Sequence, residues 1–455
     1  MSARGRETVS DSDLLIVGAG AKATAIASKV HFINQLGLGP ISLTIVEGTE
    51  PAASWLGRNG MTSGEEPLAV TPIKDIGFPY RSFKEFGEAG EALDAAVMGF
   101  SWQQHMVSLR RYARWIDAGS PSVRHRDYGE YLRWALARAT EGVTIVDGRV
   151  AGVSLEQGGQ HWQVEVEGEE GTSLQGGGAL VLTGPGIHRA FPHEPGVASR
   201  LFHCDSRREE FAQIPEHEAC DVAVVGGGES ALSCVMYLRG MRPRASFTIY
   251  TPMLPMSRGE SFLENRVFSD PDVIEWGDLD QETRRDFVKH ADRGVFDPPS
   301  LAAIAYDDRC RFVCGRVTHV GSALPGRVQV SYEAPGGGAD GEHDWVVNCT
   351  GFDLIAQLRS LFPAELRAEI ESRVGDLWET PRGVEVPIGR NLELVGMEPL
   401  LQIPGLAGLS QGPGFANLGA LGLLANRVLQ PHLPELKGGA EGNLSTADDK
   451  SLLFD

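Results

Sequence analysis

Two glycine-rich turns, each placed between an apolar strand and a helix, constrain the fold of this chain more than any other feature. The first turn follows the apolar run at 14–17 and carries Gly18, Gly20 and Ala23. Gly18 permits the tight turn, Gly20 lets the backbone approach a pyrophosphate, and Ala23 lets the helix pack closely on the strand. The next predicted strand ends in Glu47, whose carboxylate suits a ribose hydroxyl. This unit is therefore predicted to bind a dinucleotide at the helix N-terminus.

The second turn follows another apolar strand and reads GGGESA. We expect Gly226, Gly228 and Ser230 to contact a second dinucleotide there. Thr251 follows the next strand, where an acidic residue would bind the 2′-hydroxyl of NAD and repel the 2′-phosphate of NADP. The absence of an acid at this position favours NADP. Arg258, a few residues further on, is a candidate partner for the 2′-phosphate.

Two later strands end in Thr-Gly, the second of them in Thr350 and Gly351, which we expect to lie at a cofactor. Two dinucleotide units in one chain indicate a flavin that is held and a nicotinamide that exchanges. The sequence predicts an α/β fold with two Rossmann-like dinucleotide-binding domains, in which an inserted NADPH-binding domain splits the FAD-binding domain. The predicted ranges are 10–210 for the first FAD-binding part, 215–345 for the NADPH-binding domain with a substrate loop near 255–300, 346–432 for the second FAD-binding part with the substrate region, and 433–455 for a flexible tail.

Charge and composition narrow the possible functions. The chain has 41 Lys and Arg against 61 Asp and Glu, a net charge of −20, so no nucleic-acid partner is predicted. It has no apolar run of about 18 residues, so no membrane partner is predicted either. Six cysteines without a CxxC pair predict no metal site and a cytoplasmic protein with reduced thiols. Cys310 and Cys314, four residues apart, are a weaker candidate for a redox pair.

Further short motifs occur in a fixed order along the chain. They are Trp55 with Gly60-Met61, Pro72 to Asp75, Arg124 to Trp134, His203 to Ser206, Gly226 to Ala231, Ser261 to Phe268, and Asp344 to Phe352. In that order they resemble the segments WH-x-GM, FLKD, R-x-E-Y-x-x-Y-x-x-W, HS, GGGQSA, SPF-x-NE-x-F and D-x-x-x-x-ATGY of the class B flavin monooxygenases. Within that class the chain resembles the N-hydroxylating branch, the L-ornithine N5- and L-lysine N6-monooxygenases, from about Asp13 to Leu429.

This resemblance implies a chemistry and a set of site residues. NADPH would reduce FAD, and reduced FAD with O2 would give a C4a-hydroperoxyflavin that converts a neutral primary amine to a hydroxylamine for siderophore or natural-product biosynthesis. Lys74 would meet the carboxylate of the small-molecule amine substrate, and Asn265 would lie near substrate and nicotinamide. Trp55 and Met61 would lie near the flavin. No catalytic acid or base is identified, and a homo-oligomer, dimer or tetramer, is expected from the relatives.

Departures from the family pattern leave the substrate open between lysine, ornithine and a related amine. The family has a glutamine near the flavin five residues before the lysine, and this chain has Ala69 there. Whether Gln103 or Gln104 takes its place stays open. The TNYS segment that grips ornithine in relatives has no clear match, because the region at 294–300 reads GVFDPPS.

Three alternative functions remain at this point. Another class B reaction, S-oxidation or Baeyer–Villiger insertion, is one, although the Baeyer–Villiger fingerprint F-x-G-x-x-x-H-T-x-x-W is absent. A disulfide reductase would need a CxxC or C-x4-C cysteine pair near the flavin, and the sequence has neither. A nucleotide-binding protein without activity would consume no NADPH when amines are supplied.

Overall fold

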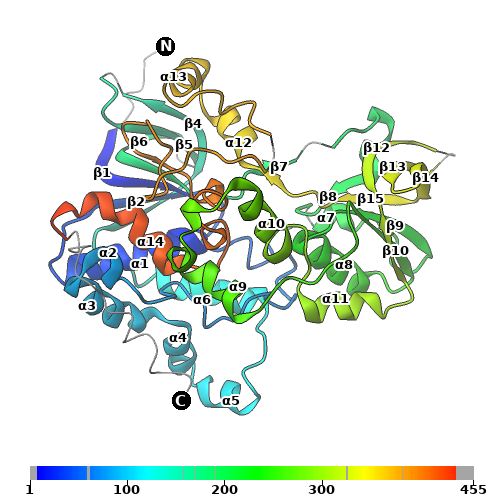
Figure 1. Ribbon diagram of the computed structural model, residues 1–455, viewed down its shortest axis with the longest axis horizontal. Coiled ribbons are helices and arrows are strands. Elements are labelled where there is room, and N and C mark those ends of the chain that lie inside the picture. The colour runs from blue at the N-terminus through cyan, green and yellow to red at the C-terminus, as the bar shows by residue number, and fades with distance from the viewer. Residues whose placement is uncertain are drawn as a thin grey trace.

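The computed structural model describes residues 8–436 apart from 59–61, 157, 170, 190, 207, 324, 325 and 382. Two largely parallel sheets, one toward the left and one toward the right of Figure 1, form the centres of two units. Met61 and nearly all of the predicted tail, from residue 437 onward, lie outside the described residues.

The first sheet has the strand order β3-β2-β1-β6-β5-β4, and β17 also pairs with β6. Strand β1 pairs in parallel with β2 and β6, whereas β4 and β5 extend the sheet in antiparallel fashion. Leu14, Leu15 and Ile16 of β1 are fully buried, as expected for a strand covered on both faces. The strands are β1 (Thr8–Val17), β2 (Leu43–Glu47), β3 (Val143–Asp147), β4 (Arg149–Leu155), β5 (Trp162–Gly168), β6 (Gly171–Leu182) and β17 (Leu401–Gln402).

Helix α1 (Ala21–Gln35) follows the first glycine turn and is buried along most of its length. It packs against α14 (Leu421–Leu429), so the C-terminal part of the chain returns to the first unit. Figure 1 shows these two helices side by side. The other helices in the segments before β3 and after β16 are α2 (Phe83–Phe86), α3 (Glu88–Val97), α4 (Trp102–Ser108), α5 (Tyr112–Asp117), α6 (His125–Leu136), α12 (Leu354–Leu361) and α13 (Ala364–Val374).

The second sheet is entirely parallel, with the order β11-β10-β9-β15-β8. Its strands are β8 (Leu201–His203), β9 (Cys220–Val225), β10 (Ala245–Thr251), β11 (Cys310–Cys314) and β15 (Trp345–Asn348). Its helices are α7 (Arg208–Phe211), α8 (Glu229–Met241), α9 (Phe262–Ser269), α10 (Gln281–Ala291) and α11 (Pro298–Ala305). An antiparallel sheet lies beside it and contains β12 (Arg316–Ser322), β13 (Val328–Ala334) and β14 (Gly337–His343).

A short antiparallel ribbon lies where the chain passes between the two units. It consists of β7 (Ile187–His188) and β16 (Phe352–Asp353), with His188 opposite Phe352. The two strands follow the two Thr-Gly sequences that the sequence analysis singled out. The chain thus leaves the first unit and returns to it through one hydrogen-bonded ribbon.

Both predicted strand–turn–helix–strand units are present, each with parallel strands. The second sheet begins at β8, inside the range 10–210 that was assigned to the first FAD-binding part, so the domain ranges stay a prediction. Cys310 and Cys314 stand at the two ends of β11. Four residues of strand span about 13 Å, whereas disulfide-bonded Cα atoms lie within about 7 Å. The candidate redox pair is therefore wrong, and both thiols are free.

None of the helices in the described part of the chain combines the length and the apolar character needed to cross a bilayer.

Candidate active site

The first glycine turn has the backbone geometry of a phosphate cradle. Gly18 has a φ of +91°, in the left-handed region that favours glycine. A Cβ added to Gly20 would meet no atom within 4 Å, so open space lies in front of the α1 N-terminus. Ala23 is fully buried on the helix side. The turn thus offers free backbone N–H groups and room for an anion, which fits the pyrophosphate of a dinucleotide.

Glu47 and Lys22 border this turn. The Glu47 carboxylate accepts hydrogen bonds from the backbone N–H of Ala19 over 2.7 Å and of Thr49 over 2.9 Å. Glu47 therefore fixes the turn, and its remaining lone pairs are available to a ribose. The Lys22 ammonium donates to the carbonyl of Ala416 over 3.3 Å, and burial lowers the pKa of Lys22 to about 8.

The second glycine turn is more tightly enclosed. Gly226 has a φ of +154°, and a Cβ there would collide with the backbone carbonyl of Cys349. Gly351 also has a positive φ of +94°, and the N–H and hydroxyl of Thr350 both donate to Asn348. Gly228 precedes the first turn of α8, so the α8 N-terminus faces the turn as α1 does in the first unit.

A cavity of about 350 Å³ lies between the two units. It combines residues of the first unit, the nucleotide unit and the C-terminal segment at 417–419. The cavity brings together five of the predicted site residues, namely Trp55, Lys74, Ser230, Arg258 and Asn265. Among the described residues, the other predicted site residues do not line it, namely Gly18, Gly20, Ala23, Glu47, Gly226, Gly228, Thr350 and Gly351. Met61 lies outside the described residues.

Lys74 and Asn265 meet inside this cavity although they come from different units. The Lys74 ammonium donates to Asn265 Oδ1 over 2.9 Å. The Asn265 amide nitrogen in turn donates to the carbonyls of Glu260 and Ser261, which fixes the side chain. Burial, and next the charge of Arg258, lower the pKa of Lys74. A half-buried cation beside a second cation favours an incoming anion.

Arg258 spans the cavity from the nucleotide unit to the first unit. Its guanidinium donates to the carbonyl of Ala69 over 2.7 Å and to the Glu260 carboxylate over 2.6 Å. It also lies 3.5 Å from Glu229. Arg258 was predicted as a partner for a 2′-phosphate. In the structure it lies in the cavity between the two units and contacts both of them.

Glu229 is a site residue that the sequence analysis missed. It stands where the family motif GGGQSA has glutamine, and this difference was the available signal. The structure places Glu229 in the cavity at the first turn of α8. Burial raises the pKa of Glu229 to about 7; Arg258 opposes this rise and Asp297 adds to it. Its carboxyl group can therefore exchange a proton near neutral pH.

The other side of the cavity is formed by the first unit. Trp55 lines it and makes edge contacts with His125 and Tyr128, with ring centroids 5.3 Å apart in each case. Ala69, at the position of the family glutamine, lines the cavity as well. Gln103 and Gln104 lie on α4 and are not among the described residues that line it.

The two glycine-rich turns and the cavity between the two units indicate the class of protein. This arrangement is typical of an oxidoreductase that holds one dinucleotide and admits another beside an enclosed substrate site. The family model of L-lysine 6-monooxygenase/L-ornithine 5-monooxygenase matches residues 97–308.

Curated relatives extend this match over nearly the whole chain. L-lysine N6-monooxygenase MbtG of Mycobacterium sp. (strain MCS) is 35% identical over 432 residues, which cover 91% of this chain and 94% of the relative. The MbtG protein of Mycobacterium tuberculosis is 34% identical, again over 91% of this chain and 94% of the relative. The chain therefore belongs to the L-lysine 6-monooxygenase/L-ornithine 5-monooxygenase family.

Solved structures agree with this assignment. Lysine monooxygenase NbtG from Nocardia farcinica, described for an unprecedented NADPH domain conformation, is 32% identical with a TM-score of 0.77, covering 93% of this chain and 98% of that one. Kutzneria sp. 744 ornithine N-hydroxylase KtzI, with reduced FAD, NADP+ and L-ornithine, has a TM-score of 0.74 at 16% identity, covering 94% of this chain and all of that one. At that identity the second likeness shows the fold alone.

The predicted class B flavin monooxygenase fold, the dependence on FAD, NADPH and O2, and the N-hydroxylation of a primary amine are confirmed. The comparisons favour this family over the three alternative functions, namely another class B reaction, a disulfide reductase and an inactive nucleotide-binding protein.

Proposed function

We propose that the protein hydroxylates the N6 amine of L-lysine and that Lys74 binds the carboxylate of that substrate. The observation that carries the proposal is the Lys74–Asn265 pair inside the cavity between the two units. The half-buried Lys74 ammonium donates to an amide, and no carboxylate among the described residues is its hydrogen-bond partner, so it is suited to pair with a carboxylate from outside. The L-lysine N6-monooxygenases that match at 34–35% identity support lysine as that substrate.

Negative charge that suits the side-chain ammonium of lysine is also present in the cavity. Glu229, Asp292 and Asp297 line the same cavity as Lys74. A cationic side chain entering between these carboxylates is attracted to them, while the substrate carboxylate is drawn to Lys74. The cavity therefore distinguishes the two ends of an amino acid that carries a second amine.

The substrate amine must lose a proton before its nitrogen can react. A lysine ammonium has a pKa of about 10.4 in water, and an enclosed site lowers that value by desolvation. We propose that Glu229, with its pKa raised to about 7, accepts this proton. In this assignment the protein's part in the reaction is to orient the amine, exclude water and receive one proton.

The two cradles are proposed to hold the cofactors. FAD would be held by Gly18, Gly20, Ala23 and Glu47 at the first turn, with Trp55 nearby. NADPH would be held by Gly226, Gly228, Ser230 and Arg258, with Thr350 and Gly351 at the return strand. The bound flavin supplies the activation of O2, and the nicotinamide supplies the reducing equivalents.

Location, assembly and pathway are proposed more broadly. We propose a cytoplasmic homo-oligomer that serves siderophore or natural-product biosynthesis. The support for the location is that all six cysteines are free thiols, as expected in a reducing compartment.

A substrate panel tests lysine as the substrate. The panel measures hydroxylamine product, because uncoupled flavin also oxidises NADPH. We expect kcat/KM for L-lysine to exceed that for L-ornithine by about tenfold or more, since one methylene in a fitted pocket is worth that much. Equal or better turnover of ornithine would overturn the choice of lysine.

A further inference from the structure

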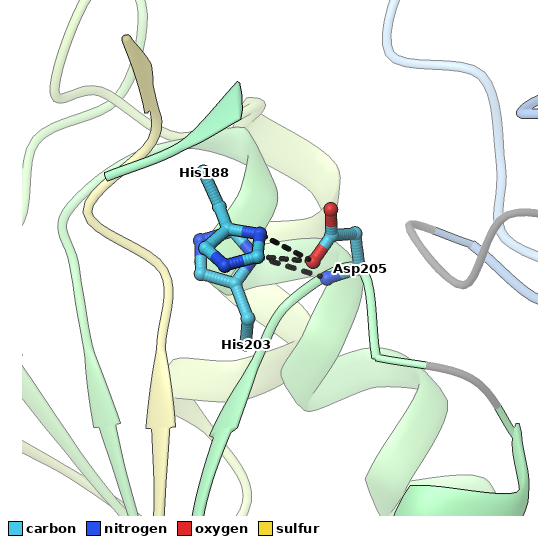
Figure 2. Close-up of side chains that lie close together, drawn as sticks. All are labelled: His188, His203 and Asp205. Carbon is cyan, nitrogen blue, oxygen red and sulfur yellow. Dashed lines mark hydrogen bonds and ion pairs between the residues drawn. The ribbon is translucent and has the colours of Figure 1, made fainter. Parts of the chain in front are cut away.

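Three potential metal ligands gather beside the ribbon that connects the two units. His188 lies on β7 of the ribbon, His203 lies on β8 at the edge of the second sheet, and Asp205 follows β8. Figure 2 shows the two imidazole rings stacked, with the Asp205 carboxylate facing both. The three residues are outside the cavity described above.

The geometry of the cluster is compact. His203 Nδ1 lies 2.5 Å from Asp205 Oδ1, and His188 Nδ1 lies 3.7 Å from the same oxygen. One ligand atom from each residue lies within 4.8 Å of the other two. A tetrahedral ion with bonds of about 2.0–2.2 Å separates its ligand atoms by roughly 3.3 Å, so small side-chain shifts suffice.

The fold holds these ligands at different levels of burial. His203 is 8% exposed, whereas the His188 side chain is 58% exposed and gives access from solvent. The ring of His203 also lies edge-on to Phe352 of the ribbon, with centroids 5.6 Å apart. His203 Nε2 is buried and has no hydrogen-bond partner among the described residues, so the polar contacts of this ring all lie on its Nδ1 side. The carboxylate side of the ring is therefore the side that a bound ion would use.

The donor atoms of the cluster indicate which ions it can hold. Cys204 Sγ lies 3.6 Å from His203 Nδ1, but it is not one of the grouped ligand atoms, and Cys204 lines the cavity instead. Two imidazoles and a carboxylate are ligands for zinc and for neighbouring divalent transition metals, whereas magnesium and calcium prefer oxygen ligands alone. The donor set therefore selects a class of ion.

We propose that His188, His203 and Asp205 form a binding site for a divalent transition metal ion such as Zn2+. The ion takes the place of the proton that joins His203 to Asp205, and that proton leaves to solvent. His188 belongs to the β7–β16 ribbon, and His203 belongs to β8 at the edge of the second sheet. The bound ion therefore links the ribbon to the nucleotide unit. The spacing of the cysteines does not indicate this site, because its ligands come from two separate strands and the residues that follow one of them.

Zinc titration of the FAD-loaded protein, after dialysis against a chelator and with any affinity tag removed, tests the site. Isothermal titration calorimetry should show one Zn2+ per chain for the wild-type protein and no heat for Mg2+. His188→Ala should weaken zinc binding by at least about tenfold. Because this side chain is exposed, the variant should keep the fold, and its flavin spectrum checks this.

A matched control and a second variant make the result decisive. His217→Ala removes a histidine that is 83% exposed and lies outside the cluster, and it should leave the zinc affinity unchanged. Asp205→Asn should weaken binding as His188→Ala does. No zinc binding to the wild-type protein, or equal binding by the wild type and both cluster variants, would overturn the proposal. Neither outcome depends on which amine is hydroxylated.

Discussion

The two glycine-rich turns share a backbone pattern, yet they open onto different surroundings. The first turn lies on a buried strand and is fixed by Glu47, which accepts from the backbone of the turn itself. The second turn leads into α8, whose first residues Glu229 and Ser230 line the cavity between the units. From this difference we propose that the first turn retains its dinucleotide and that the second admits one beside the substrate.

The largest expected effect concerns the first cradle. Gly18→Val places a β-branched residue at a φ of +91°, with its Cβ 3.4 Å from the Thr183 hydroxyl. We expect the purified protein to be colourless, measured as the ratio of flavin to protein absorbance. Gly37→Val is the control, because Gly37 has a φ of +69° but no atom within 4 Å of an added Cβ. A Gly18→Val protein of normal yellow colour would remove this turn from the flavin site.

The second glycine turn should respond to a glycine-to-alanine change without losing the flavin. Gly226→Ala drives a Cβ into the carbonyl of Cys349, which displaces the turn. We expect a yellow protein whose flavin is reduced by NADPH with a KM raised about tenfold or more, the effect of a misplaced binding loop. Gly240→Ala, inside α8 with open space around the added Cβ, should leave that KM unchanged. Loss of flavin by Gly226→Ala would contradict the division of roles between the turns.

The effect expected from Glu229 depends on pH and leaves flavin binding intact. Since its pKa is raised to about 7, the carboxyl group is protonated below that pH and accepts a proton above it. The kcat/KM for the amine should therefore rise with pH through about 7 in the wild-type protein. Glu229→Gln should remove this limb and lower the rate at high pH by about 100-fold, the scale of one proton-transfer group. An unchanged pH profile in Glu229→Gln would exclude Glu229 as the acceptor.

The sequence predicted the parts of the fold that depend on local pattern. Apolar strands, small residues at the turns and the order of the motifs were sufficient for two parallel units, because these features are read within about 30 residues. The limits of the units were less predictable. Strand β8 joins the second sheet through pairing with β15, in which Leu201 lies opposite Val346, and no local signal marks that contact.

Some residues of the site could be predicted from the sequence, and others could not. Lys74 and Asn265 were found through motif resemblance, and the structure brings them within 2.9 Å of each other. Glu229 was missed because it lies inside a motif that was taken for a phosphate-binding turn alone. Its raised pKa arises from burial and from Asp297, which are properties of the folded cavity rather than of the sequence.

The most direct test of the account compares L-lysine with cadaverine, which is lysine without its carboxylate, in the wild-type protein and Lys74→Ala. A charge-assisted contact contributes about 1.5–3 kcal/mol, which corresponds to about 10- to 100-fold in an equilibrium constant. We predict that Lys74→Ala raises KM for L-lysine by about that factor, with the KM for cadaverine and the flavin content unchanged. An unchanged KM for L-lysine, or an equal rise for both amines, would contradict the claim that Lys74 binds the substrate carboxylate.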